Sequence, residues 1–207
     1  MAASKILVIG GSGFVSGTLA RLARSQGDEV WVVTRGRKAL PDGVVPIRAD
    51  RKDQGAFKAA VNGAGVRWDL VVDCIGYEVD DMRQDLELFP ALARHLVFIS
   101  TDFVFDPARR RFPQPCDNPA TLTDDSYGGK KRRCELELLK ADTGEMRWTV
   151  FRPCHIYGPG SMLGCLPAAA RDPDLLRKIK AGEPIRLVVG GHFLQQPIFA
   201  PDLAALM

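Results

Sequence analysis

Short apolar runs rich in β-branched residues alternate with longer amphipathic segments along most of this chain. Near-continuous apolar runs are expected of strands whose two faces are both covered by helices. The runs occupy residues 5–10, 29–34, 44–49, 70–75, 95–100 and 148–152. This alternation is typical of βαβ units, so the sequence predicts an α/β fold with a doubly wound parallel sheet of the Rossmann type.

The segments between these runs predict helices, and one segment predicts a long loop. The helices are expected over residues 14–26, 54–62, 80–93 and 126–141. Residues 106–123 are rich in Pro, Asp and Asn without periodicity, which predicts a surface loop of the kind that is often functional. Beyond residue 160 we expect a helix at 174–181, a strand at 185–189 and a last helix that begins near Pro201.

Composition and charge argue against several classes of partner. The 28 basic and 25 acidic residues give a formal charge of +3, too small to demand a nucleic-acid or membrane partner. No stretch approaches the ~20 apolar residues of a membrane span, and no signal peptide is recognisable, so a cytoplasmic protein is expected. The five cysteines form no CxxC pair, so we expect structural thiols and no metal site.

A glycine cluster follows the first predicted strand directly and opens the first predicted helix. Glycine there permits a tight turn and lets the backbone approach a pyrophosphate, whose charge the helix N-terminus stabilises. In the GxxGxxG spacing Gly10 and Gly13 match, whereas Ser16 holds the third place with Gly17 beside it. The alternative is a glycine-rich turn that binds nothing. The expected contacts are Gly10, Gly11, Ser12, Gly13, Phe14 and Val15.

The end of the second predicted strand favours NADP over NAD. Proteins of this fold that prefer NAD place an acidic residue there, whereas an arginine accommodates a 2′-phosphate. Here Arg35 ends the strand and Arg37 follows, so both are expected phosphate partners, with a solvated basic loop or adenine stacking by Arg35 as alternatives. The other expected cofactor contacts are Asp50 and Arg51, which an ordinary strand-end turn also explains, and Cys74 and Gly76. We therefore expect an NAD(P)-binding domain over 1–160 and the start of a truncated, smaller substrate-binding region over 161–207.

Tyr127 and Lys131 are four residues apart at the start of a predicted helix, so their side chains face the same way. An ammonium and an oxidised nicotinamide both favour the phenolate of a tyrosine, whose pKa is ordinarily ~10, so Tyr127 is the expected acid/base. Thr101 can hydrogen-bond the same substrate oxygen. Lys130 rivals Lys131, and a solvated helix face is the alternative for the pair. The two glycines between them suggest the close approach of something bulky.

Four motifs occur in the order GGSGFVSG, ISTDFVFD, YGGKK and RPCHIYGPG, and KAGEPIRLVVGG with QQPIFAPDLA follows. Together they resemble the extended short-chain dehydrogenase/reductase family, which includes nucleotide-sugar epimerases, dehydratases and reductases. ISTDFVFD is similar to dTDP-4-dehydrorhamnose reductases and less fully to dTDP-glucose 4,6-dehydratases, but Phe103 stands where elimination needs an acid. TRG and ADRKD are more loosely similar to the chloroplast stem-loop-binding proteins, which associate with RNA.

The resemblance implies roles for individual residues. Thr101, Tyr127 and Lys131 match the catalytic triad, and Lys131 would also hold the nicotinamide ribose. Pro153 would line the nicotinamide, His155 stands where relatives often place a substrate-contacting Asn, and a satisfied loop histidine is its alternative. Asp102 and Phe103 complete the expected substrate contacts. Pairing of the helices at 80–93 and 126–141 would form a homodimer.

We therefore expect an NADP-dependent reductase or epimerase acting on a hydroxyl or ketone of a nucleotide-linked sugar. One alternative is a reductase of another small carbonyl compound, flavonoid-like or lipid-derived. The other is an RNA-binding or regulatory protein on the same scaffold, using the basic runs at 109–111 and 130–133. The substrate and the direction of hydride transfer do not follow from the sequence.

Overall fold

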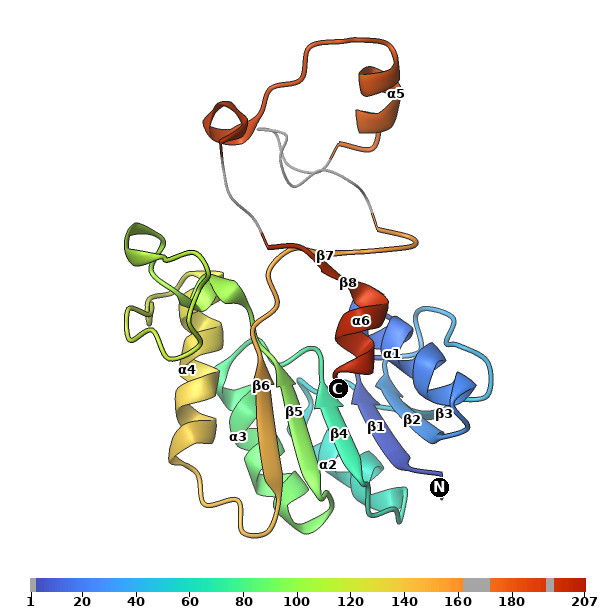
Figure 1. Cartoon of the computed structure of the whole chain (residues 1–207). Helices are drawn as coiled ribbons and strands as arrows, with labels where there is room; N and C mark the ends of the chain where they lie inside the picture. The colour runs from blue at the N-terminus through green and yellow to red at the C-terminus, as the bar shows by residue number, and fades with distance from the viewer. Residues whose placement is uncertain (1–2, 162–171, 193–195) are drawn as a thin grey trace.

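The computed structural model describes residues 3–161, 172–192 and 196–207 and has the predicted α/β architecture (Figure 1). A six-stranded sheet forms the centre of the molecule, and helices cover both of its faces. Its strands are β1 (Lys5–Ile9), β2 (Glu29–Thr34), β3 (Val45–Arg48), β4 (Leu70–Asp73), β5 (His95–Ile99) and β6 (Arg147–Phe151). The main helices are α1 (Phe14–Ser25), α2 (Gln54–Gly63), α3 (Val79–Leu88), α4 (Tyr127–Lys140) and α6 (Ala200–Ala205).

The strands pair in the order β3-β2-β1-β4-β5-β6, and every pair in this sheet is parallel. The chain runs outward from β1 to β3 and then returns to begin the other half of the sheet at β4. In open sheets of this kind, ligands bind outside the carboxyl ends of the strands, at the point where the strand order reverses. That point lies between β1 and β4.

Side chains that alternate along each strand divide into two apolar cores, one on each face of the sheet. In β1, Leu7 and Ile9 pack with the core that includes Phe57 of α2, Met82 of α3 and Leu138 of α4. Ile6 and Val8 pack with the other core, which includes Leu19 and Ala23 of α1 and Ala204 of α6. The four inner strands β1, β2, β4 and β5 therefore bury residues on both faces, as their near-continuous apolar runs predicted, whereas the edge strand β3 buries only Ile47.

Two predicted elements differ from the structure. The helix expected over 80–93 ends at Leu88 and continues as a 3-10 turn, η1 (Phe89–Ala91), because Pro90 lacks the N–H that an α-helix needs. The strand expected over 185–189 is wrong: Val188–Gly191 forms a 3-10 turn, η4. The last two residues of the expected strand lie in this turn, which Gly190 and Gly191 complete with φ angles of +60° and +87°.

Residues beyond 152 form smaller elements above the carboxyl ends of the strands (Figure 1). A parallel pair, β7 (Ile156–Tyr157) and β8 (Ile198–Phe199), leads into α6, which packs beside α1. The helix expected at 174–181 is present as α5 (Leu175–Lys180), and the last helix begins at Ala200 with Pro201 in its first turn. No helix among the described residues has the length and apolar character needed to cross a bilayer.

Candidate active site

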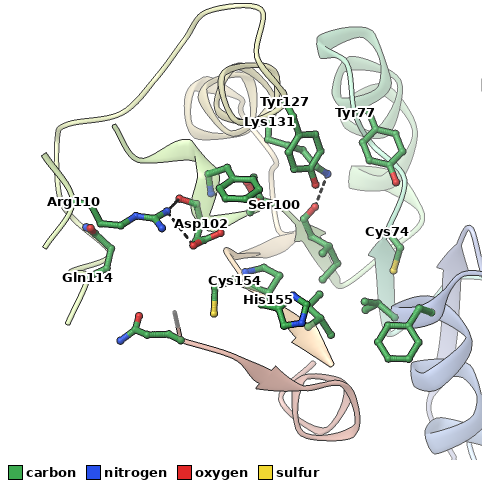
Figure 2. Close-up of a pocket in the computed structure, with 18 of the residues that line it drawn as sticks. Cys74, Tyr77, Ser100, Asp102, Arg110, Gln114, Tyr127, Lys131, Cys154 and His155 are labelled. Atoms are coloured by element: carbon green, nitrogen blue, oxygen red, sulfur yellow. Dashed lines mark hydrogen bonds and ion pairs between the residues drawn. The ribbon is translucent and has the colours of Figure 1, made fainter. Parts of the chain in front are cut away.

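A pocket of about 530 Å³ lies at the carboxyl ends of the central strands (Figure 2). It extends from the N-terminus of α1, past the end of β5 and the start of α4, to the segment that follows β6. The predicted site residues that line it are Phe14, Val15, Cys74, Thr101, Asp102, Phe103, Tyr127, Lys131, Pro153 and His155. Residues from five distant segments thus meet where the strand order reverses, the usual place for a ligand in this fold.

The glycine loop between β1 and α1 is shaped partly by packing inside the protein. Gly10 has a φ of +98°, and a Cβ there would lie 2.5 Å from Ile75 Cγ2. A Cβ on Gly11 would lie 2.3 Å from Val32 Cγ1. These two glycines are therefore required by the fold itself, so the case for a bound pyrophosphate rests on the position of the loop rather than on its glycine count.

Ser16, which replaces the third glycine of the spacing, closes this loop. Its hydroxyl donates to the Gly10 carbonyl at 2.6 Å and accepts from the Gly13 N–H at 3.0 Å. Ser16 is buried, so these two bonds fix the loop against the first turn of α1. That turn carries no acidic residue, which leaves the positive end of the helix free of a competing anion.

Tyr127 and Thr101 face each other across the pocket. Ser126 caps α4, its hydroxyl accepting the Gly129 N–H at 3.1 Å, and this places Tyr127 in the first turn. The Tyr127 side chain is half-exposed, whereas Thr101 is buried at the end of β5. Burial raises the pKa of the Tyr127 phenol, and a hydrogen bond with the Thr101 side chain offsets part of that rise. Without further positive charge, Tyr127 is therefore a neutral phenol.

Lys131 is 1% exposed, and its ammonium lies deep in the pocket. Nζ donates to the carbonyl oxygens of Gly76 and Ile99, both at 2.6 Å, and lies 4.9 Å above the ring of Tyr77. Burial lowers the pKa of Lys131, while the nearby Asp73 carboxylate works in the opposite direction. Lys130, its rival in the sequence, points outward and pairs with Glu78 of the helix cap at 2.8 Å.

The close approach expected at the two glycines of α4 comes from the protein's own backbone. A Cβ on Gly128 would lie 1.9 Å from the Phe103 carbonyl oxygen, and one on Gly129 would lie 2.3 Å from that of Asp124. The start of α4 therefore packs directly on the loop that follows Thr101. These glycines set the distance between the threonine and the tyrosine.

Arg51, an expected cofactor contact after β3, lies in a buried cluster of charged side chains. Its side chain is 3% exposed and pairs with Asp73 at 2.9 Å and with Asp85 at 2.6 Å. Burial and the Asp73 carboxylate both raise the pKa of Asp85. At Asp73 burial acts in the same direction, but Arg51, a hydrogen bond with Asp85 and the Lys131 ammonium together lower the pKa. Asp73 Oδ1 in turn accepts the Ile75 N–H at 2.9 Å, so this cluster shapes the turn that presents the Gly76 carbonyl to Lys131.

The residues expected around the adenosine lie at the outer ends of β2 and β3. Arg35 and Arg37 are exposed, and Arg35 lies 3.8 Å from the carboxylate of Asp50. Gly36 has a φ of +75°, and its N–H donates to the Thr34 hydroxyl at 3.1 Å. The two arginines are therefore accessible to a ligand, with Asp50 as an acidic neighbour.

Glu135 joins three parts of the site beneath the pocket. It is 1% exposed, accepts the Ser100 hydroxyl at 2.6 Å, and binds Arg152 through both carboxylate oxygens at 2.9 and 2.7 Å. Arg152 also donates to the Cys116 carbonyl at 2.7 Å. Glu135 therefore ties α4 to the ends of β5 and β6 and to the long loop. Sequence reasoning did not single out this residue.

Several residues that sequence reasoning missed also line the pocket, and Arg110 is one of them. Asp102 pairs with Arg110 of the long loop at 3.0 Å, and Figure 2 shows the two side chains meeting at the pocket wall. The other missed lining residues are Tyr77, Ile99, Ser100, Phe112, Gln114, Cys154, Ile156 and Gln196. Most lie in segments without periodicity, so no sequence pattern predicts that they face the pocket. Among the described residues no group of three His, Cys, Asp or Glu could hold a metal ion.

Comparison with known families decides which group of proteins this pocket belongs to. The sequence model of the NAD dependent epimerase/dehydratase family matches residues 6–207. The chain belongs to this family. The resemblance expected from the motifs is thereby confirmed, while the closer likeness to dTDP-4-dehydrorhamnose reductases stays a prediction.

Solved members of the family share the fold of this epimerase/dehydratase chain. The enzyme WbmG of Bordetella bronchiseptica, solved with NAD and UDP, matches 99% of this chain and 67% of its own with a TM-score of 0.74 and 19% identity. The UDP-glucose 4-epimerase of Thermotoga maritima, solved with UDP-glucose, matches 97% of this chain and 71% of its own with a TM-score of 0.77 and 18% identity. At these identities the likeness confirms the fold.

One curated relative has a different description. The chloroplast stem-loop binding protein of 41 kDa b of Arabidopsis thaliana is 28% identical over 221 residues, which cover 97% of this chain and 53% of that protein. The looser resemblance to this group of proteins is thereby confirmed. The chain spans about half the length of this relative.

Proposed function

We propose that this epimerase/dehydratase family member is a nicotinamide-dependent reductase or epimerase that acts on a hydroxyl or ketone of a nucleotide-linked sugar. One observation carries the proposal: Thr101, Tyr127 and Lys131 line a single pocket that begins at the N-terminus of α1. The NAD, UDP and UDP-glucose named with the solved relatives agree with this class of cofactor and substrate.

We expect different residues of the pocket to hold the cofactor, orient the substrate and transfer the proton. A bound nicotinamide would supply the acceptor or donor of the hydride. The N–H groups of the first turn of α1 would hold its pyrophosphate, and Lys131 would hold its ribose. Thr101 would orient the substrate oxygen. In reduction Tyr127 would donate a proton to that oxygen as the neutral phenol that burial favours. In oxidation Tyr127 would remove the proton as a phenolate, the form that Lys131 and an oxidised nicotinamide would favour.

Some observations support a preference for NADP, and others support a preference for NAD. Arg35 and Arg37 are exposed at the end of β2 and would pair with the 2′-phosphate of NADP. Asp50 competes for Arg35, and WbmG was solved with NAD. We retain NADP as the preferred cofactor and expect Arg35→Ala with Arg37→Ala to weaken NADPH binding and to leave NADH binding nearly unchanged. Titration followed by nicotinamide fluorescence tests this, and equal loss of both cofactors would contradict it.

An RNA-binding role is the second candidate because of the chloroplast relative. The ion pairs within the two basic runs argue against it. In the run at 130–133, Lys131 is buried and the other three residues pair with the acidic residues Glu78, Glu135 and Asp125. In the run at 109–111, Arg109 pairs with Asp106 and Arg110 with Asp102. Charges neutralised within the protein release few counterions from RNA. We therefore expect no shift of mixed RNA in a gel at physiological salt.

The experiment that tests the proposed function is substitution of the phenol. Tyr127→Phe should leave cofactor binding within about twofold and lower turnover by roughly 10²- to 10⁴-fold, because only the proton-transferring hydroxyl is lost. UDP-glucose and its 4-keto form are the first substrates to use. Unchanged turnover in Tyr127→Phe would contradict the assigned role of Tyr127 in proton transfer.

The homodimer through α3 and α4 stays a prediction.

A further inference from the structure

Asp102 is held in the pocket by its backbone and by its side chain. It directly follows Thr101, and its N–H donates to the Pro153 carbonyl at 3.1 Å. Arg110 Nη2 lies 2.7 Å from the Asp102 carbonyl oxygen and 3.0 Å from its Oδ2. The carboxylate is therefore fixed one residue beyond the threonine that would contact the reacting oxygen.

The Asp102 carboxylate retains capacity to accept hydrogen bonds. An ionised carboxylate accepts about four hydrogen bonds, and the contact with Arg110 uses part of that capacity. Its side chain is 20% exposed, and Asp102 lines the pocket, so the carboxylate is accessible from the substrate side. A hydroxyl group is the natural donor to such an acceptor.

We propose that Asp102 accepts a hydrogen bond from a hydroxyl group next to the reacting carbon of the substrate, and that Arg110 is the positioning residue that keeps this carboxylate in place. This rests on the proposed function and narrows its substrate class to a ring with neighbouring hydroxyl groups. A ketone without such a hydroxyl would leave a half-buried carboxylate without its donor, which disfavours binding.

The two aromatic residues beside this pair fit the same substrate class. Phe103 and Phe112 are exposed and line the pocket. Phe103 precedes Arg110 in the sequence, and Phe112 follows it. Their rings offer apolar surface to the C–H face of a sugar ring, while Asp102 takes a hydroxyl at its edge. Gln114 and His155 also line the pocket and add polar groups to it.

The pair also predicts a pH dependence. Burial raises the pKa of Asp102, and Arg110 opposes that rise. Tyr127 and Cys154 also face Asp102, and both have raised pKa values, so they stay neutral at acidic pH. Loss of Arg110 should raise the pKa of Asp102 further, and the acid limb of the kcat/KM profile should move to higher pH.

The test compares four variants of the full chain with UDP-glucose and with its 2-, 3- and 6-deoxy analogues. With C4 as the reacting carbon the neighbouring hydroxyl is the one on C3, so wild type should prefer UDP-glucose over the 3-deoxy analogue by roughly 10- to 100-fold in kcat/KM, as expected for a hydrogen bond to a charged group. A preference over the 2- or 6-deoxy analogue alone would contradict the proposal. Asp102→Ala should abolish the preference over the 3-deoxy analogue. Arg110→Met should weaken it and move the acid limb, and Arg110→Lys should restore part of both. Arg109→Met is the matched control, because Arg109 is exposed and pairs with Asp106 outside the pocket.

Cofactor titration and calorimetric binding of UDP-glucose separate the ways in which the test can fail. If the cofactor and UDP-glucose bind but every variant discriminates as wild type does, the role of Asp102 and Arg110 is overturned and the proposed function stands. If the cofactor binds but UDP-glucose neither binds nor reacts, the proposed substrate class is wrong and this inference falls with it. All variants keep His155. A shift of the acid limb of the kcat/KM profile that is seen only in Arg110→Met therefore reports on Asp102.

Discussion

Two groups of arginine and aspartate flank the pocket, and they differ in how far water reaches them. Arg51 binds Asp73 and Asp85 with side chains no more than 3% exposed. Arg110 and Asp102 pair with side chains 15% and 20% exposed. The same chemistry therefore occurs once inside the fold, where it shapes a turn, and once at the pocket wall, where a ligand can reach it. Burial, rather than residue type, distinguishes the structural group from the pair that we propose contacts the substrate.

The largest expected effect comes from breaking the buried group. Arg51→Met should lower the free energy of unfolding by about 3–5 kcal/mol, because it leaves buried carboxylates without their cation. Urea denaturation of the purified variant measures this. A loss below about 1 kcal/mol would mean that proton sharing between Asp73 and Asp85 suffices, and the contrast between the two groups would disappear.

Glu135 lies between these extremes, since it is buried but bonded to several donors. Glu135→Gln should cost about 1–3 kcal/mol, because Arg152 loses its charged partner. Burial acts to raise the pKa of Glu135, but hydrogen bonds from Arg152, Ser100 and Arg132 outweigh it and lower the pKa. The stabilisation from Glu135 is thus complete above its unfolded pKa of ~4.3 and is lost as pH falls through the lower folded value.

Thermal unfolding from pH 6 to pH 3 checks that sign. The difference in Tm between wild type and Glu135→Gln should be largest near pH 6 and should shrink below about pH 4. A difference that grows on acidification would contradict the assignment. Lys140→Gln, a substitution at the exposed end of the same helix, serves as the control.

At the pocket wall the effect on stability should be smaller than the effect on substrate preference. Arg110→Met should change the free energy of unfolding by less than about 1 kcal/mol, because water and a substrate can reach the Asp102 carboxylate when Arg110 is absent. Chemical denaturation alongside Arg51→Met makes the comparison direct. Equal losses in the two variants would show that both arginines are structural.

The smallest effect is expected at the rival lysine. Lys130→Ala removes an exposed ion pair with Glu78 and should change stability by no more than about 0.5 kcal/mol, with cofactor binding unchanged. Lys131→Ala, on the same helix, should weaken cofactor binding. If the two variants exchanged these behaviours in a cofactor titration, the lysine assignment would have to move by one residue.

The sheet and its covering helices could be predicted because their pattern is local. Apolar runs with β-branched residues mark β1, β2, β4 and β5, and the order of the motifs places the residues that meet in the pocket. The role of Arg51 could not be predicted, because RADRKD has the composition of an exposed turn and its partners Asp73 and Asp85 come from β4 and α3. Only the fold brings those carboxylates together.

The two glycines of α4 and the long loop also show that a local sequence pattern does not identify a residue's partner in the fold. Gly128 and Gly129 correctly indicated a close approach, but the approaching group is the protein backbone at Phe103 and Asp124. Arg110 lies in a segment with no periodicity, so nothing local distinguishes it from Arg109. A charged residue in a loop acquires its role from the side chain that it meets.

The long loop also bears on how this scaffold could be altered. Its base is closed where the Asp106 N–H donates to the Ala120 carbonyl and the Leu122 N–H to the Val104 carbonyl. Between these bonds the chain adds Arg110, Phe112 and Gln114 to the pocket and no strand to the six-stranded sheet. We therefore expect a library confined to residues 110–114 to sample new specificities, while the Cys116 contact with Arg152, the proposed catalytic residues and the core are all kept.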